Sequence, residues 1–74
     1  MVELVETIAK ALVDDPDAVQ VTEIPETQTI QLRVAPDDMG RVIGKQGRIA
    51  KAIRVVVKAM ATKAGTKVTV EIVE

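Results

Sequence analysis

The sequence feature that most constrains this chain is a Gly-x-x-Gly turn at residues 44–47, placed between two segments with the apolar spacing of helices. Gly44 and Gly47 can take positive φ and have no Cβ, so another backbone can approach the main chain closely. A helix that starts just after Gly47 has unpaired N–H groups and the positive end of its dipole at this point. We therefore expect the turn to bind an anion, and phosphate in particular.

Basic side chains surround this turn. Lys45 lies within it, and Arg41, Arg48 and Lys51 flank it on either side. Four cations around one exposed stretch of backbone indicate a polyanion rather than a single small ion.

Charge is divided unevenly along the chain. Residues 1–38 hold nine acidic and two basic residues, a net of −7, whereas residues 39–74 hold eight basic and two acidic residues, a net of +6. A basic half around a glycine turn indicates a nucleic-acid partner. The alternative is that these charges are simply the solvated face of an ordinary helix.

Length and composition exclude several classes of protein. A chain of 74 residues predicts one small domain, residues 1–74, that buries only about 60% of its unfolded surface. The sequence has no Cys and no His, so we expect no disulfide, metal site or cofactor. The N-terminus lacks the pattern of a signal peptide, and no apolar run approaches the roughly 20 residues of a membrane span. We expect a cytoplasmic protein with no membrane partner.

The first half of the chain predicts a helix and a hairpin. Residues 2–13 have apolar side chains at helical spacing, and Pro16 should end this helix near residue 14. Residues 18–24 and 29–34 alternate in polarity and predict two antiparallel strands.

A pair of aspartates follows the hairpin. The order Ala35-Pro36-Asp37-Asp38 predicts the start of a short helix with Asp37 or Asp38 as its N-cap. The two carboxylates could instead be metal ligands or a catalytic dyad. We favour capping, because no third ligand stands at a calcium-loop spacing and no His is present.

Residues 48–64 predict the longest helix, followed by Gly65 as a C-cap and a third strand at residues 66–73. The predicted order is α-β-β-α-α-β, an α+β fold. The apolar side chains expected to face the core are Ile49, Ile53, Val56, Val57 and Met60.

The second half of this long helix, residues 55–61, is apolar almost all the way round. A helix with one solvent-exposed face should carry polar side chains on that face. We therefore expect Val55, Ala59 and Met60 to be buried against another subunit. The alternative is scattered surface valine and alanine, which is common in soluble proteins.

The segment V-I-G-K-Q-G-R-I at residues 42–49, followed by A-K-A-I, resembles the core motif of KH domains, V-I-G-x-x-G-x-x-I. The whole chain, including D-D-M-G-R-V-I-G-K-Q-G-R at residues 37–48, is similar to the small single-domain bacterial KH proteins of the KhpA type. This resemblance implies a type II KH domain, with three helices on one face of a three-stranded mixed sheet. It also implies binding of about four nucleotides of single-stranded RNA or DNA.

The resemblance further implies which residues bind and which partners to expect. Glycines allow close approach, the two residues between them donate to phosphate, and the flanking cations widen the positive rim. The implied RNA-binding residues are Arg41, Val42, Gly44, Lys45, Gln46, Gly47, Arg48 and Lys51. Proteins of this type are expected to form homodimers, to pair with a larger Jag-type KH protein, and to act as post-transcriptional regulators or RNA chaperones.

The lack of aromatic residues agrees with a backbone clamp. Modules that hold single strands by stacking need Phe, Tyr or Trp, and this sequence has none. Stacking contributes about 1–3 kcal/mol per base where it exists, so we expect weak and sequence-tolerant binding here.

Three other functions are less well supported. A P-loop enzyme would need four residues between its glycines and Ser or Thr after the lysine, whereas Gly40 and Gly44 are separated by three and Gln46 follows Lys45. Without His, Cys or Ser we expect no catalytic residue. A helix-turn-helix unit for duplex DNA is disfavoured by the three strands. A protein-pairing module, with nucleic-acid binding secondary, remains the main alternative.

Overall fold

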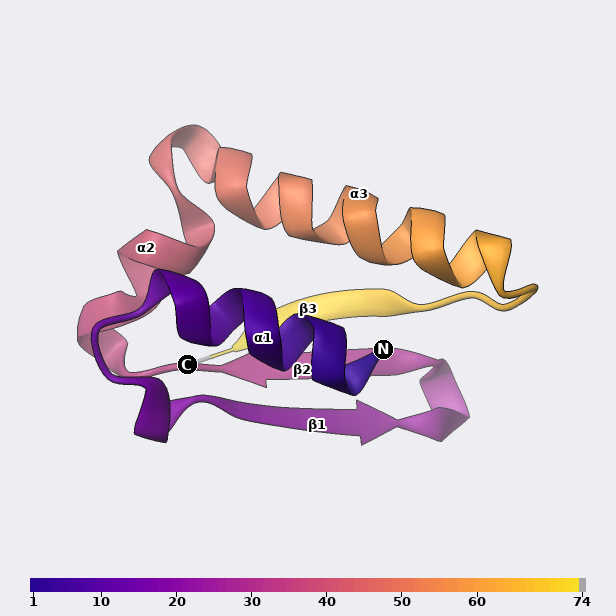
Figure 1. Cartoon of the computed structure of the whole chain (residues 1–74), viewed down its shortest axis with the longest axis horizontal. Coiled ribbons are helices and arrows are strands. Elements are labelled where there is room, and N and C mark those ends of the chain that lie inside the picture. The colour runs from indigo at the N-terminus through magenta and orange to yellow at the C-terminus, as the bar shows by residue number, and fades with distance from the viewer. Residues whose placement is uncertain (74) are drawn as a thin grey trace.

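The computed structural model describes residues 1–73, in which three α-helices cover one face of a three-stranded sheet (Figure 1). The elements are α1 (Val2–Leu12), β1 (Gln20–Ile24), β2 (Thr29–Arg33), α2 (Met39–Ile43), α3 (Arg48–Lys63) and β3 (Thr69–Val73). Short 3-10 turns lie at Pro16–Ala18, Pro25–Thr27, Pro36–Asp38 and Lys45–Gly47. The α+β class and the order α-β-β-α-α-β are as predicted.

The sheet is mixed, with β2 in the centre. It pairs antiparallel with β1 and parallel with β3. A parallel pair needs a long crossover, which α2 and α3 supply on the helical face of the sheet. The turn between these two helices therefore projects beyond one end of the sheet, at the upper left of Figure 1.

The core between helices and sheet is aliphatic. The alternating side chains of β2, Ile30 and Leu32, are buried together with Val34 just beyond the strand, as the pattern predicted. Their buried neighbours in the core are Val5, Ala9, Val42, Ile53, Val57 and Val70. None of the helices formed by residues 1–73 is long and apolar enough to cross a membrane.

The first helix ends at Leu12, two residues before the predicted end near residue 14. Val13 is already extended, with φ −95° and ψ 159°, and Asp15 lies outside the α region at φ −117° before Pro16. The first strand starts later than predicted, at Gln20, because a 3-10 turn occupies Pro16–Ala18.

The long helix faces the core with a different stripe from the predicted one. Its buried residues are Ala50, Ile53, Val57 and Ala61, whereas Val56 and Met60 are exposed. The prediction was wrong for Val56 and Met60 because the predicted sector left out Ala50 and Ala61, which the structure buries. Alanine at two core positions instead lets α3 lie close to its neighbours, and the larger side chains lie outside this stripe.

Gly65 ends α3 as predicted. It has φ 79°, its amide donates to the Thr62 carbonyl at 3.0 Å, and the Thr66 amide donates to the Ala61 carbonyl at 2.9 Å. This pair of bonds is a Schellman motif, which satisfies carbonyls at the end of the helix. The third strand consequently begins at Thr69 rather than at residue 66.

Candidate nucleic-acid interface

The glycine turn joins α2 to α3 through three residues with positive φ. Gly44 has φ 76° and ψ 173°, Gln46 has φ 59°, and Gly47 has φ 74°. The conformation of Gly44 is essentially restricted to glycine. Space is also restricted there, because a Cβ on Gly44 would lie 2.6 Å from Cγ1 of Ile49. The turn therefore requires glycine at its first position for two independent reasons.

Backbone donors gather at the end of this turn. The Gly47 amide donates to the Gly44 carbonyl at 3.1 Å and the Arg48 amide donates to that of Lys45. The amides of Lys45 and Gln46 precede these bonds, at the position where a helical turn has no internal acceptor. Within residues 1–73, no side chain caps the N-terminus of α3. The positive end of the α3 dipole is thus available to an anion.

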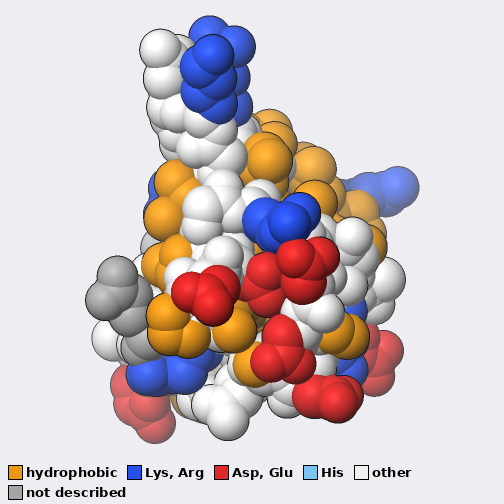
Figure 2. All heavy atoms as spheres, turned by 90° about the vertical axis from the view of Figure 1, so that its left-hand side faces the viewer, with side chains coloured by type: hydrophobic (Ala, Val, Ile, Leu, Met, Phe, Trp, Pro, Cys, Tyr) orange, Lys and Arg blue, Asp and Glu red, His pale blue; other side chains and the backbone are white. Residues whose placement is uncertain are grey.

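The side chains of the turn are exposed. Lys45, Gln46 and Arg48 all lie at the surface, and Nη2 of Arg48 donates to Oε1 of Gln46 at 3.2 Å. Lys51 is exposed about one helical turn further along α3. In Figure 2 the turn is the column at the top, with a basic side chain beside it.

Cations continue along α3 beside the edge strand. Arg54 is exposed, and its Nε donates to the carbonyl of Val70 in β3 at 3.2 Å. Lys58 follows one turn later and lines an open groove of about 380 Å³ with Lys67 and Thr69. The basic surface therefore runs from the turn along the α3 side that borders β3.

Two of the predicted RNA-binding residues, Arg41 and Val42, do not present an exposed, unpaired side chain at the turn. Val42 is wholly buried in the core, so its side chain holds α2 in place and does not reach the surface. Arg41 is exposed but ion-paired, with Nη2 2.9 Å from Oδ2 of Asp14 and Nε 3.5 Å from Oδ1 of Asp38. Val42 was predicted as an RNA-binding residue, and its burial leaves its side chain only the role of positioning α2.

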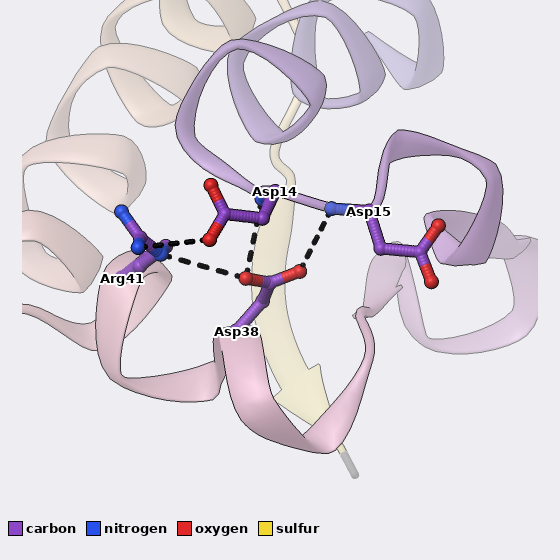
Figure 3. A network of polar contacts seen from close by, with 4 residues as sticks. All are labelled: Asp14, Asp15, Asp38 and Arg41. Carbon is purple, nitrogen blue, oxygen red and sulfur yellow. Dashed lines mark hydrogen bonds and ion pairs between the residues drawn. The ribbon is translucent and has the colours of Figure 1, made fainter.

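The sequence predicted Asp37 or Asp38 as the N-cap of the short helix, and Asp38 occupies the N-cap position of α2. Its two oxygens accept the backbone amides of Asp14 and Asp15, at 3.2 and 3.1 Å (Figure 3). No side chain among the described residues caps α2. Asp38 is only 3% exposed, and its bonds tie the segment after α1 to the start of α2. The predicted N-cap position is confirmed, but the side chain makes no capping bond because these distant amides occupy both carboxylate oxygens.

The sequence pattern gave little sign of this network. Asp38 at the N-cap of α2 and Arg41 within it are three residues apart, a spacing that is a local signal of their ion pair. The partners in residues 14 and 15 lie more than twenty positions away. Within residues 1–73, no group of three or more acidic side chains is arranged to hold a metal ion.

The predicted dimer contacts lie on an exposed apolar face of α3. Val55 is 57% exposed and Met60 is 47% exposed, and Ala59 lies at the surface between them. Beside them, α1 and α3 border a shallow groove of about 320 Å³. Its apolar lining comes from Ile8, Leu12, Ile49, Ala52, Ile53 and Val56.

The chain is similar to known proteins over nearly its whole length. The family described as "KhpA/KhpB, KH domain" matches residues 2–72. RNA-binding protein KhpA of Clostridium acetobutylicum is 63% identical, over 99% of this chain and 100% of the relative. The protein of that name from Caldanaerobacter subterraneus subsp. tengcongensis is 65% identical over the same shares of both chains. That of Aquifex aeolicus is 51% identical, over 97% of this chain and 94% of the relative.

No solved structure gives a significant match. The family match nevertheless covers the sheet, all three α-helices and the glycine turn between α2 and α3. The chain therefore belongs to the KhpA/KhpB family of KH domains.

Proposed function

We propose that this protein binds single-stranded RNA by clamping the sugar-phosphate backbone at the turn formed by residues 44–47. The observation that carries the proposal is the conformation of this turn, with Gly44 and Gly47 at positive φ and uncapped donors at the start of α3. Relatives that are 63% and 65% identical are named RNA-binding protein KhpA, which supports RNA as the ligand. The KhpA/KhpB KH-domain family is not a family of enzymes, so we assign no catalytic residue.

In this proposal the two glycines allow the RNA backbone to approach the main chain. The amides of Lys45 and Gln46 donate to phosphate oxygens, and the ammonium group of Lys45 neutralises charge. Arg48 and Lys51 extend the positive surface along α3. Single-stranded DNA presents the same phosphates, and we expect weaker discrimination between the two than between single and double strands.

Low sequence specificity follows from the same chemistry. Backbone contacts carry no base information. The chain also has no Phe, Tyr or Trp on which a base could stack. A cytoplasmic RNA chaperone or a global post-transcriptional regulator would use binding of this kind, and we propose that role here.

Salt dependence tests the clamp. With about four phosphates neutralised on a single strand, log K should fall with log salt at a slope near −3. A rise from about 50 to 200 mM salt should then weaken binding on the order of fifty-fold. Fluorescence anisotropy with a labelled eight-nucleotide RNA measures this slope. A slope near zero would contradict the proposal, as would equally strong competition by a duplex of the same length.

We also propose a second function, pairing with another KH protein, either a second copy of this chain or a larger Jag-type partner. The observation that favours it is the apolar surface formed by Val55, Val56, Ala59 and Met60 with the neighbouring α1–α3 groove. Exposed apolar patches of this kind commonly mark protein interfaces. The surface lies on a different side of α3 from the cations at Arg54 and Lys58.

A charge placed in this surface should break the pairing. Ala59→Asp is expected to convert a dimer to a monomer, because burying an unpaired carboxylate in an apolar interface costs several kcal/mol. Analytical ultracentrifugation measures the change in mass. Lys58→Asp, which introduces the same group on the charged side of α3, should leave the mass unchanged. Pairing through this surface is wrong if Ala59→Asp keeps the parent's mass, or if both variants shift it equally.

A further inference from the structure

Arg41 stands three residues before the glycine turn, yet its guanidinium already has two carboxylate partners. Nη2 lies 2.9 Å from Oδ2 of Asp14, and Nε lies 3.5 Å from Oδ1 of Asp38 (Figure 3). Asp38 is held in turn by the amides of Asp14 and Asp15. The side chain of Arg41 is therefore directed toward Asp14, in the segment that follows α1.

The surroundings of Arg41 are acidic. Asp14, Asp15, Asp17 and Asp37 lie exposed on the neighbouring segments, with Asp38 buried beneath them. Figure 2 shows acidic side chains gathered below the projecting turn, with a basic side chain against them. A phosphate that approached Arg41 would compete with Asp14 for Nη2 and would meet the repulsion of the surrounding carboxylates.

We infer that Asp14 and Asp38 keep Arg41 from contacting RNA, so that Arg41 is a positioning residue for α2. The exposed carboxylates around it, which we call the acidic edge, limit the surface that RNA can contact on this side of the turn. The acidic edge consists of Asp14, Asp15, Asp17 and Asp37. This inference rests on the proposed function, since it concerns the same site. The RNA phosphates then contact Lys45, Arg48 and Lys51, and Asp14 is the residue that keeps Arg41 out of that set.

Removing the charge of Asp14 should therefore add one cation to the site. In Asp14→Asn the Nη2 atom loses its partner while Nε stays beside Asp38, so the outer end of the guanidinium becomes available to a phosphate. One further phosphate contact steepens the salt slope by about 0.7 and raises affinity about five-fold at 100 mM salt. Arg41→Gln in the parent should change affinity less than two-fold and leave the slope unaltered.

The double variant Asp14→Asn, Arg41→Gln separates release of Arg41 from a general loss of negative charge. If Arg41 provides the gain, this double variant should return to the affinity of the parent. Asp17→Asn is the matched control, because it removes one exposed carboxylate of the same edge; it should change affinity less than two-fold. The inference is overturned if Arg41→Gln alone weakens binding about five-fold with a slope flatter by about 0.7. It is equally overturned if the gain of Asp14→Asn survives in the double variant or is matched by Asp17→Asn.

NMR of the unmodified protein gives a readout that does not depend on the folding of any variant. The Nε–H signal of Arg41 should stay in place when the eight-nucleotide RNA is added, while the amides of Lys45 and Gln46 shift. A shift of the Arg41 signal equal to theirs would overturn the inference and leave the clamp intact. If the amides of the turn stay in place while RNA binds elsewhere, the proposed function fails, and the inference fails with it.

Discussion

Replacing Gly44 by alanine is expected to lower the free energy of unfolding by about 4 kcal/mol. The backbone at φ 76° and ψ 173° is a glycine-only conformation, and a side chain there costs roughly 1–3 kcal/mol. The new methyl group would also lie 2.6 Å from Cγ1 and 2.8 Å from Cβ of Ile49. Crowding of this kind costs a further 1–3 kcal/mol or so, because Ile49 is branched at Cβ and stiff.

Thermal unfolding followed by circular dichroism measures this effect. For a domain of this size, about 4 kcal/mol corresponds to a fall in Tm on the order of 20 °C. Gly47→Ala is the matched control, since φ is again positive at 74° but a Cβ there has nothing within 4 Å. It should cost only about 1 kcal/mol, the left-handed backbone term alone. Equal losses of unfolding free energy in the two variants would show that contact with Ile49 is not what excludes a side chain at position 44.

The double variant Lys45→Asp, Gln46→Asp is expected to weaken RNA binding on the order of 100-fold at 100 mM salt. One cation is lost, and two carboxylates are placed where phosphate should lie; each change is worth about five-fold under these conditions. The fold should persist, because both side chains are exposed and aspartate tolerates the left-handed conformation of Gln46 at φ 59°. Fluorescence anisotropy measures the affinity and circular dichroism the fold.

The control for this variant carries the same change of charge on α1. Thr7 and Lys10 are exposed on that helix, and Thr7→Asp, Lys10→Asp reduces the net charge by the same amount. Long-range repulsion alone should weaken binding only a few-fold, since exposed charges are screened beyond about 10 Å at this salt concentration. The site assignment is wrong if the turn variant binds as well as the parent, or if the two variants weaken binding equally.

Local sequence patterns were sufficient where one residue type imposes one geometry. The alternation of Ile30, Leu32 and Val34 gave the buried face of the central strand, because side chains alternate between the two faces of a sheet. Gly44 and Gly47 take the positive φ that their lack of Cβ permits. Gly65 likewise ended α3 with the expected bonds.

Local sequence patterns did not predict which residues are buried or bonded where tertiary contacts determine this. Residues 55–61 are apolar nearly all round, so periodicity could not tell which sector of α3 faces the sheet. The structure buries Ala50 and Ala61, whose small size permits close packing, and exposes Val56 and Met60. The side chain of Asp38 bonds to amides more than twenty residues away, which no local rule for helix capping could reveal.

The surroundings of the predicted site residues were likewise predictable where local geometry sets them, and unpredictable where tertiary packing does. The motif placed Lys45, Gln46 and Arg48 on an exposed turn, which their local geometry explains. It could not show that Val42 is buried or that Arg41 is held by Asp14, because both depend on how α2 packs against the rest of the chain.

Titration of the ¹⁵N-labelled protein with single-stranded RNA, followed through its backbone amide signals, tests the central claim most directly. The account predicts that the amides of Lys45, Gln46 and Gly47, with those of the first turn of α3, show the largest shifts at saturation. The opposite face of the sheet, which includes Gln31 and Glu71, should stay in place. Unchanged signals at the turn with shifts on that face would contradict a phosphate clamp between α2 and α3.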